Sequence, residues 1–259
     1  MNNATYDSVN KAWKGTCKSI FGEEIGELKE YEAYLREGLI GKPVKSHFSG
    51  KELWVVSTAH HKNAKFFDYE KERSHAEKTL SKPTNINDIK DIDSLLNAVK
   101  EKALYSGNTV LGNSKNVEYS DTIVDSMSIL NSSMIIGNKY VAYAYLSQYT
   151  ECSFGSTSSG QSAHIIRCFY NNSIKRCFEC STSVALSDSY FSYNCLNSTD
   201  CMFSFNLRGK QHMIANVQLE KQQYADLKKK LLVEITEKLK GKKRFDFSII
   251  DIVNGWEYA

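Results

Sequence analysis

The sequence predicts a mainly β protein, in which a right-handed parallel β-helix lies between an α+β region and a C-terminal helix. Three observations predict this fold. Charge density changes along the chain, because residues 116–207 hold 11 charged side chains in 92 whereas the other 167 residues hold 52. The same charge-poor stretch repeats with a period of about 12 residues. The chain also has 15 tyrosines, 12 phenylalanines and only two prolines, a composition that favours sheets over helix bundles.

Composition limits the classes of protein that this chain can belong to. With 259 residues, 41% hydrophobic residues and a net charge of +3, it is long and apolar enough for one or two folded domains. The apolar runs are too short to cross a bilayer, and the N-terminus lacks the basic-then-apolar order of a signal peptide. Seven cysteines, an odd number, favour reduced thiols over a disulfide framework. We therefore expect no membrane contact and a location in the cytoplasm, or in a particle assembled there.

Residues 1–108 are expected to form the α+β region. Apolar residues at helical spacing predict helices at 6–21, 23–36 and 87–104. Short runs of β-forming residues predict strands at 52–56 and 64–69, which we expect to pair with each other. The third helix is amphipathic, and its apolar face is formed by Ile89, Ile92, Leu95, Leu96, Val99 and Leu104.

Residues 109–219 contain the repeat. Its equivalent positions are spaced by 12, 12, 13, 12 and 12 residues: Tyr140, Cys152, His164, Cys177, Ser189 and Cys201. A polar tripeptide precedes each of them, and alternating side chains such as Phe191, Tyr193 and Cys195 follow the period of two that is typical of strands. Less regular copies extend back to about Val117, which gives about eight units.

A short strand and a polar turn repeated at fixed length predict a solenoid, because one unit cannot bury its apolar face without its neighbours. Two units per coil give coils of 24 residues, so the eight units predict about four coils and a height of roughly 20 Å. An antiparallel sandwich is the alternative, since it also has short strands at this spacing. The Asn-Gly or Asp-Gly pairs of tight hairpins do not occur in the repeat, which favours the solenoid.

Residues 220–259 are expected to close the solenoid. A capping helix is predicted at 220–240, with an apolar stripe formed by Tyr224, Leu227, Leu231, Leu232, Ile235 and Leu239. Such a cap covers the unpaired sheet edge of the last coil. A further strand is predicted at 245–250, paired with the N-terminal strands, so that the two flanking regions form one body.

The segment Ser198–Lys228, which includes Leu207-Arg-Gly-Lys-Gln-His-Met-Ile-Ala-Asn216, resembles the closing segment of a family of uncharacterised repeat β-helix proteins. These proteins occur in uncultivated bacteria, archaea and their viruses, and they carry serial Asn/Ser-x-x-Cys-Tyr-x-x-Tyr repeats. The resemblance covers about residues 115–238. It departs from the family pattern at Gly209, where Asn is usual, and at His212, where Tyr is usual. The resemblance implies a fold and no activity.

Three short motifs are candidate sites, although none of them matches a known site pattern completely. Cys177 and Cys180 form the only close cysteine pair, but a zinc site needs further ligands in register, so thiols stacked inside the solenoid are the simpler interpretation. The segment 155–162 has the glycine spacing of a phosphate-binding loop but lacks its lysine and its helix, which favours a polar turn. His60, His61 and His75 are weak metal candidates without a known ligand spacing, and surface histidines are the alternative.

The most basic segment is a candidate nucleic-acid site formed by Lys238, Lys240, Lys242, Lys243 and Arg244. Its alternative is the solvated end of a helix. The acids of the repeat are Glu118, Asp121, Asp125, Glu151, Glu179, Asp188 and Asp200. Asp121 and Asp125 are close in sequence, but most of the others are expected at turns, where they cap, so no catalytic pair is evident.

We therefore expect a non-catalytic structural or protein-interaction module that needs no cofactor and acts with a protein partner or by self-assembly, for example in a virion. Two alternatives stay open. One is nucleic-acid binding through the basic C-terminal helix, and the other is a carbohydrate-binding or carbohydrate-active β-helix.

Overall fold

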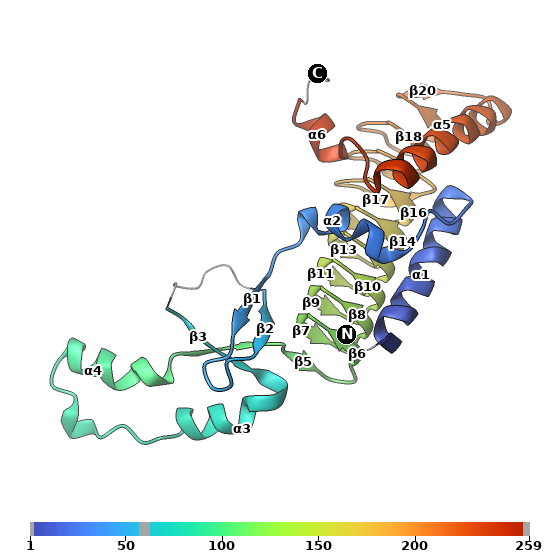
Figure 1. The fold of residues 1–259 in the computed structure, drawn as a ribbon. Coiled ribbons are helices and arrows are strands. Elements are labelled where there is room, and N and C mark those ends of the chain that lie inside the picture. The colour runs from blue at the N-terminus through green and yellow to red at the C-terminus, as the bar shows by residue number, and fades with distance from the viewer. Residues whose placement is uncertain (1–2, 57–62, 256–259) are drawn as a thin grey trace.

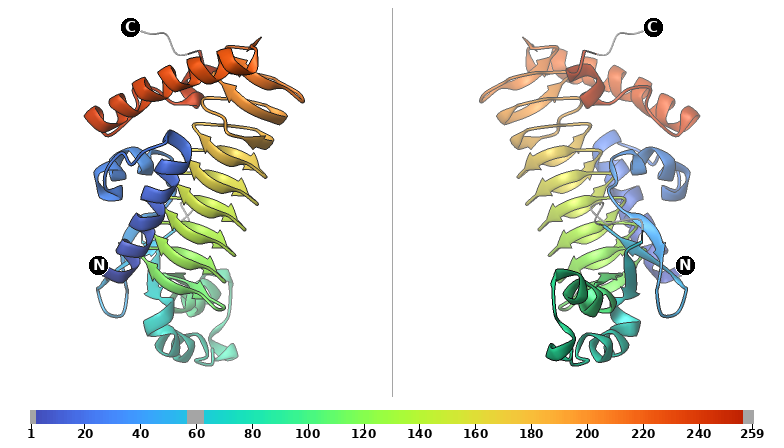
Figure 2. Two further views of the ribbon diagram at one scale, coloured as in Figure 1. Left: turned by 90° about the vertical axis from the view of Figure 1, so that its right-hand side faces the viewer. Right: turned by 90° about the vertical axis from the view of Figure 1, so that its left-hand side faces the viewer.

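The computed structural model describes residues 3–56 and 63–255, and its centre is a column of stacked parallel coils (Figure 1). Helix α1 (Asn3–Phe21) lies along one side of the column, and helix α5 (Lys221–Lys242) crosses its C-terminal end. A lobe that contains helices α3 (Tyr69–Leu80) and α4 (Ile92–Val99) projects from the opposite end (Figure 2). The predicted β-helix, the N-terminal helices and the C-terminal helix are thus all present.

Two parallel ladders of short strands build the column. The first ladder contains β6 (Lys115–Glu118), β8 (Met127–Leu130), β10 (Lys139–Ala142), β12 (Glu151–Phe154), β14 (Ala163–Ile166) and β16 (Lys175–Phe178). The second contains β5 (Val110–Leu111), β7 (Asp121–Val124), β9 (Ser133–Ile136), β11 (Tyr145–Gln148), β13 (Thr157–Gly160) and β15 (Phe169–Asn172). Strands β17 (Val184–Ser187), β18 (Leu196–Met202) and β19 (Gln211–Ile214) continue the stack, and β20 (Val217–Gln218) folds back antiparallel on β19.

One coil takes 12 residues, so the predicted 24-residue coil is wrong. The strand partners along the first ladder mark nine successive coils: Lys115, Met127, Lys139, Glu151, Ala163, Lys175, Ser187, Thr199 and Gln211. Each repeat unit therefore closes a whole coil, and the column has nine coils instead of four. At the usual spacing of neighbouring strands its height is about 40 Å.

The coil closes in 12 residues because the chain bends at every third residue. From Asn116 to Ala215 every third residue has a positive φ, and only Gly137, Gly155 and Gly209 among them are glycines. The residue after each bend points into the tube. Inward side chains thus recur with a period of three residues and not with the predicted period of two. The single 13-residue step in the predicted repeat, from His164 to Cys177, passes from a bend position to an inward position of the next coil.

Small polar side chains fill much of the tube and satisfy the backbone at the bends. Ser132 accepts a hydrogen bond from the backbone N–H of Ala144 in the next coil and donates one to the carbonyl of Leu130. The same step of 12 residues links Ser120 to Ser132, and other inward serines and asparagines follow it. Buried backbone groups that the strands leave unpaired are therefore bonded by side chains.

Helix α1 covers the first ladder over most of its length. A helix of 19 residues is about 28 Å long, which matches the rise of the six strands β6 to β16. Trp13 of α1 is buried, packs against Tyr31 and Phe154 with ring centroids 5.3 Å away in both cases, and donates a hydrogen bond to the carbonyl of Gly26. This helix and the outward residues of the first ladder share one hydrophobic cluster with the C-terminal segment.

The segment after α1 is broken into short pieces. The predicted helix at 23–36 is wrong in extent, because the chain forms a 3-10 helix η1 (Leu28–Tyr31), a single turn α2 (Glu32–Leu35) and a second 3-10 helix η2 (Arg36–Gly38). This path passes directly over the bend at Gly155, where an added Cβ would lie 2.9 Å from a methyl carbon of Leu35. Glycine is therefore needed there.

The lobe is built from two strand pairs, which a parallel bridge between Ser46 and Phe66 connects. Strand β1 (Lys42–Lys45) pairs antiparallel with β2 (Glu52–Val55), and β3 (Lys65–Asp68) pairs in parallel with β4 (Leu104–Gly107). The predicted pairing of strands 52–56 and 64–69 with each other is therefore wrong. Helix α3 lies outside the predictions, and the predicted helix 87–104 contains only α4, flanked by 3-10 turns η3 (Ile86–Asp88) and η4 (Lys100–Lys102).

The C-terminal segment packs on the column as a helix. The predicted strand at 245–250 is wrong, because residues 249–253 form helix α6 (Ile249–Val253), which Ser248 caps. Phe245 and Ile249 are buried in the cluster shared with α1. The two flanking regions thus meet along the side of the column, through helices and not through paired strands.

Candidate protein-binding site at the open end of the solenoid

The two ends of the column differ. The C-terminal end is covered by the β19–β20 hairpin and by α5, whereas β5 and β6 are the terminal strands of their ladders at the N-terminal end. Within the described residues β6 pairs only with β8, so its other edge is free. A free strand edge exposes backbone donors and acceptors that can pair with another strand.

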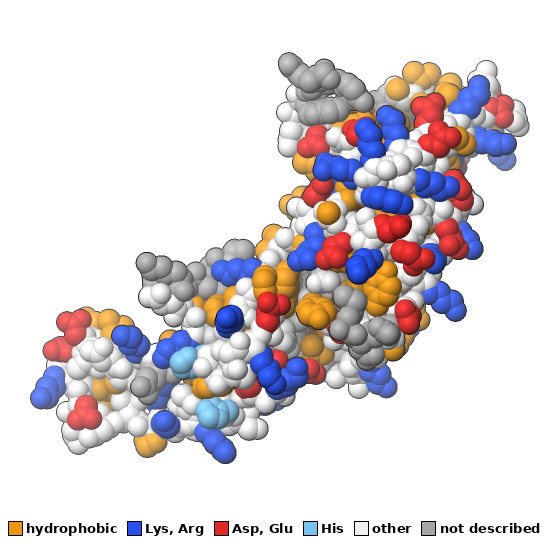
Figure 3. Space-filling model, viewed as in Figure 1, with side chains coloured by type: hydrophobic (Ala, Val, Ile, Leu, Met, Phe, Trp, Pro, Cys, Tyr) orange, Lys and Arg blue, Asp and Glu red, His pale blue; other side chains and the backbone are white. Residues whose placement is uncertain are grey.

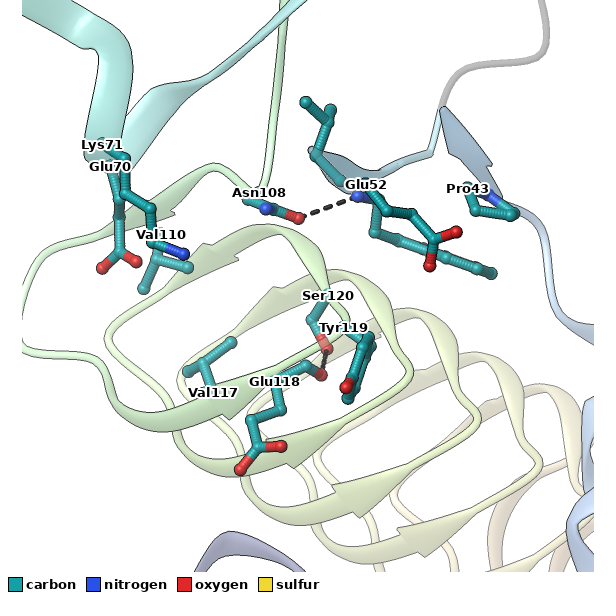
Figure 4. A pocket seen from close by; sticks show the side chains of 12 residues that line it. Pro43, Glu52, Glu70, Lys71, Asn108, Val110, Val117, Glu118, Tyr119 and Ser120 are labelled. Atoms are coloured by element: carbon teal, nitrogen blue, oxygen red, sulfur yellow. Dashed lines mark hydrogen bonds between the residues drawn. The ribbon is translucent and has the colours of Figure 1, made fainter. Parts of the chain in front are cut away.

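A cavity of about 470 Å³ lies between this end and the lobe (Figure 4). Glu70 and Lys71 line one side of it, Pro43 and Glu52 line the other, and residues 117–120 of the first coil lie below. The cavity thus joins the lobe to the free edge of β6.

Asn108 joins two strands of the lobe at the point where the chain passes from β4 into the first coil. It has a positive φ of 52°, its side-chain oxygen accepts a hydrogen bond from the backbone N–H of Trp54, and its own N–H donates to the carbonyl of Trp54. Its amide nitrogen donates to Asp68 at the start of α3. Asn tolerates this backbone conformation better than other residues with a Cβ, which explains its place at the junction.

Charge around the cavity is mainly negative. The buried carboxylate of Asp121 is already bound, because it accepts hydrogen bonds from the backbone N–H groups of Val56 and Thr109. Asp121 is not part of the lining, whose charged side chains are three acids and one base: Glu52, Glu70, Glu118 and Lys71. The cavity therefore favours a positively charged ligand.

The lobe also exposes apolar side chains. In and around α4 the exposed fraction reaches 76% at Ile92 and 73% at Ile86, and Leu95, Leu96 and Val99 are exposed as well. The amphipathic face predicted for this helix is thus present but has no partner among the described residues. Exposed apolar patches of this kind often mark protein contacts.

The predicted nucleic-acid residues lie at the end of α5 and just after it. Four of the five form ion pairs: Lys240 with Glu23, Lys242 with Asp246, Lys243 with Glu30 and Arg244 with Glu37. The fifth, Lys238, lies 5.5 Å from the ring centre of Phe245. Basic and acidic side chains alternate over this part of the surface (Figure 3), so the segment does not present a continuous positive patch.

The weak metal candidates are not brought together. His60 and His61 lie outside the described residues, and His75 packs against Phe48 with ring centroids 4.4 Å apart. In the part of the chain that the structure describes, no group of three His, Cys, Asp or Glu side chains has the geometry of a metal site. Cys177 and Cys180 point into the tube, where their thiols donate to backbone carbonyls.

The acids of the repeat mostly hold the fold. Asp188 pairs with Arg176, Asp200 pairs with Lys228, and Asp125 accepts a hydrogen bond from the N–H of Asn113. Capping and pairing of this kind agree with the interpretation of these acids as structural groups.

Glu179 is the most deeply buried acid of the repeat. It pairs with Arg167 and also accepts hydrogen bonds from the hydroxyl of Tyr34, at 2.8 Å, and from the backbone N–H of Ile249, at 3.0 Å. Burial raises the pKa of the Glu179 carboxyl, while Arg167 acts against this shift. This cluster fastens the N-terminal and C-terminal segments to the same bend of the column.

The residues of the open end were not found from the sequence. Glu52 and Glu70 belong to short elements without a motif, and only the fold brings them to the first coil. A signal was present at Glu118, which takes the outward position at which the later coils carry Leu130, Ala142 and Phe154 under α1.

The fold defines this protein as a parallel β-solenoid with a capped and an open end. A comparison with protein-family models, curated proteins and solved structures finds no match in any of the three. Among the described helices, none has the length and apolarity that a membrane span requires.

Proposed function

We propose that this protein is a non-catalytic protein-interaction module that binds an extended, basic segment of a partner chain at the open end of its solenoid. The free edge of β6 carries this proposal. A segment in extended conformation adds to such an edge by backbone hydrogen bonds, and its side chains reach the pockets beside it. Here the pocket is the acidic cavity, which selects lysine or arginine side chains.

The apolar face of α4 supports the same function, because it lies in the lobe that projects from this end (Figure 1). A folded partner that contributes the extended segment also covers these side chains. Binding to such a partner would place the protein in a larger assembly. The buried, reduced thiols agree with a reducing compartment such as the cytoplasm, or with a particle assembled there. The resemblance of the closing segment to repeat β-helix proteins is part of this proposal, and the 12-residue coils support it.

A pair of short peptides tests the proposal. An acetylated Lys-Val-Lys-Val-Lys-Val peptide is titrated into the full chain, with Glu-Val-Glu-Val-Glu-Val as its control, and fluorescence anisotropy reports binding. We expect the basic peptide to bind and the acidic one not to bind. We also expect amide exchange of residues 115–118 to slow on binding, since strand addition protects the free edge.

Charge reversal provides matched variants. Glu52→Lys with Glu70→Lys should abolish binding, whereas Glu151→Lys with Glu220→Lys makes the same change of net charge away from the cavity and should preserve it. Binding without protection of β6, or equal binding by both double variants, would contradict the proposal.

A size measurement tests the assembly. If a second copy covers α4, sedimentation of the purified chain should show a species larger than the monomer, and Ile92→Ser with Leu96→Ser should return it to the monomer. A monomer at all concentrations would exclude self-assembly through this face.

A further inference from the structure

One face of the column has no helix over it and carries almost no charge. It is formed by the outward side chains of the second ladder and of the coils that continue it, and none of these side chains is buried. Each coil contributes two of them, one on either side of its inward residue. They form two rows: residues 122, 134, 146, 158, 170, 182, 194 and 206 in one row, and 124, 136, 148, 160, 172, 184, 196 and 208 in the other. Among these 16 side chains only Arg208 is charged. We call this surface the bare face.

The bare face is hollowed at one coil. Ser158 and Gly160 of β13 stand between the larger Leu146 and Gln148 of the coil before and the larger Tyr170 and Asn172 of the coil after, and strand register aligns these rows. The result is a shallow trough of about 390 Å³. It lies in the segment 155–162, whose small residues resemble a phosphate-binding loop in sequence.

The trough displays an aromatic ring, amide groups and a bare backbone. Tyr170 is 64% exposed, and Gln148 and Asn172 are exposed beside it. Gly160 has no side chain to cover the peptide groups, and a Cβ there would lie 3.2 Å from the amide nitrogen of Asn172. None of the residues that line the trough is charged.

We infer that this trough binds a neutral saccharide. An aromatic ring packs against the C–H face of a sugar ring, and amide groups pair with hydroxyls both as donors and as acceptors. The absence of charge disfavours uronic acids, phosphates and nucleic acids. The coils before and after the trough continue the bare face in parallel register, so a linear oligosaccharide can extend along it from the trough.

The chain offers a matched pair of tyrosines for the test. Tyr149 is also 64% exposed and also has a positive φ, but it follows β11 and lies outside the bare face. Tyr170→Ala and Tyr149→Ala therefore remove the same ring from the same backbone conformation, and their melting temperatures should agree.

The probes are cellohexaose, maltohexaose, mannohexaose and xylohexaose, with oligogalacturonate as the charged control, each titrated into the full chain by calorimetry. We expect at least one neutral hexamer to bind, Tyr170→Ala to weaken it by about tenfold, and Tyr149→Ala to leave it unchanged. Ser158→Tyr should also abolish binding, because the new side chain fills the trough. The backbone tolerates tyrosine at this position, since Tyr170 occupies the equivalent position of the next coil.

Three results would overturn the inference. They are the absence of binding by all four neutral hexamers at millimolar concentration, binding of the charged control alone, and equal effects of the two tyrosine variants. The trough does not include the open end. The peptide experiment and the saccharide experiment can therefore succeed or fail independently of each other.

Discussion

The inward thiols act as small hydrogen-bonding residues of the tube. Cys201 donates to the carbonyl of Thr199, as the serines at equivalent positions do. Burial raises the pKa of the Cys201 thiol to about 12 and that of Cys152, which lies between α1 and the column, to about 11. These cysteines therefore stay protonated and weakly nucleophilic in the folded chain.

The raised pKa values predict a loss of stability at alkaline pH. An unfolded thiol has its ordinary pKa of about 9.0, whereas the folded thiol has a raised pKa, so the free energy of unfolding should fall as the pH rises from about 9 towards 12. Urea unfolding of the wild type and of Cys201→Ala across this range measures the effect. The variant should show the shallower decline, and parallel curves would contradict the assignment.

The buried pair of Arg167 and Glu179 predicts an asymmetric response to mutation. Arg167→Leu leaves Glu179 buried without its cation, which should lower the free energy of unfolding by about 3–5 kcal/mol near neutral pH. Without the arginine the pKa of Glu179 rises further, and an acid with a raised pKa in the folded state costs stability as the pH increases above its unfolded value near 4.5.

The destabilisation by Arg167→Leu should therefore be smaller at pH 5 than at pH 8, as measured by urea unfolding. The double variant Arg167→Leu with Glu179→Gln removes the unpaired charge but keeps an acceptor for Tyr34 and Ile249. It should recover part of the loss at pH 8 and should not depend on pH in this range. A pH-independent loss in the single variant would rule out a buried charge as its cause.

At the scale of the element, the coil depends on non-glycine residues whose backbone lies in the left-handed region of φ and ψ. Such a residue costs roughly 1–2 kcal/mol relative to the right-handed region. Ladder hydrogen bonds to the coil before hold these residues in place. For example, the N–H of Asn131 donates to the carbonyl of Glu118, and the N–H of Tyr143 donates to the carbonyl of Leu130.

Substitution of two alanines by glycine distinguishes this backbone strain from the entropy cost that glycine has at any position. One alanine is exposed and the other is half-buried. Ala185 has a positive φ of 51°, whereas Ala163 in β14 has no positive φ. Ala185→Gly should raise the free energy of unfolding by up to about 1 kcal/mol, because the relief of strain exceeds the entropy cost. Ala163→Gly should lower it by about 0.5–1 kcal/mol. Thermal unfolding measures both, and destabilisation of equal size at both sites would contradict the strain.

At the scale of the whole molecule, the C-terminal segment links the column to the N-terminal helices. Phe245 packs against Phe191 and Phe247 with ring centroids 4.9 Å away in both cases, and Phe178 lies 6.4 Å away. The hydroxyl of Tyr31 in η1 donates to the carbonyl of Leu239 in α5. The flanking regions thus stabilise each other through the column.

Truncation of this contact should weaken the whole chain. Phe245→Ala should cost about 3–5 kcal/mol, and helix and strand signals in circular dichroism should still be lost in one transition. Val253→Ala on the exposed side of α6 should change stability by less than about 0.5 kcal/mol. If Phe245→Ala melts like the wild type, the C-terminal segment is not part of the core.

The sequence predicts the repeat well, because stacked coils impose a constant length on the chain. It also predicts α1 and α5, whose apolar residues recur at helical spacing. It does not predict the open-end cavity, since Glu52 and Glu70 carry no local motif. It singles out the segment 155–162, which contains Ser158 and Gly160, only for its glycine spacing and interprets it as a polar turn. An alignment of the repeat at a strict step of 12 would have placed Ser158 and Gly160 between larger residues, and so indicated the trough.

The sequence by itself determined that this chain is a solenoid of 12-residue units with helices at both flanks. Only the tertiary structure decided that one unit closes one coil, because closure depends on a bend at every third residue that mostly lacks glycine and so leaves no local signal. It also decided which end is open and which apolar helix stays uncovered. Those outcomes depend on contacts between segments far apart in the chain, such as Asn108 with Trp54 and Phe245 with Phe191, and spacing along the sequence does not encode them.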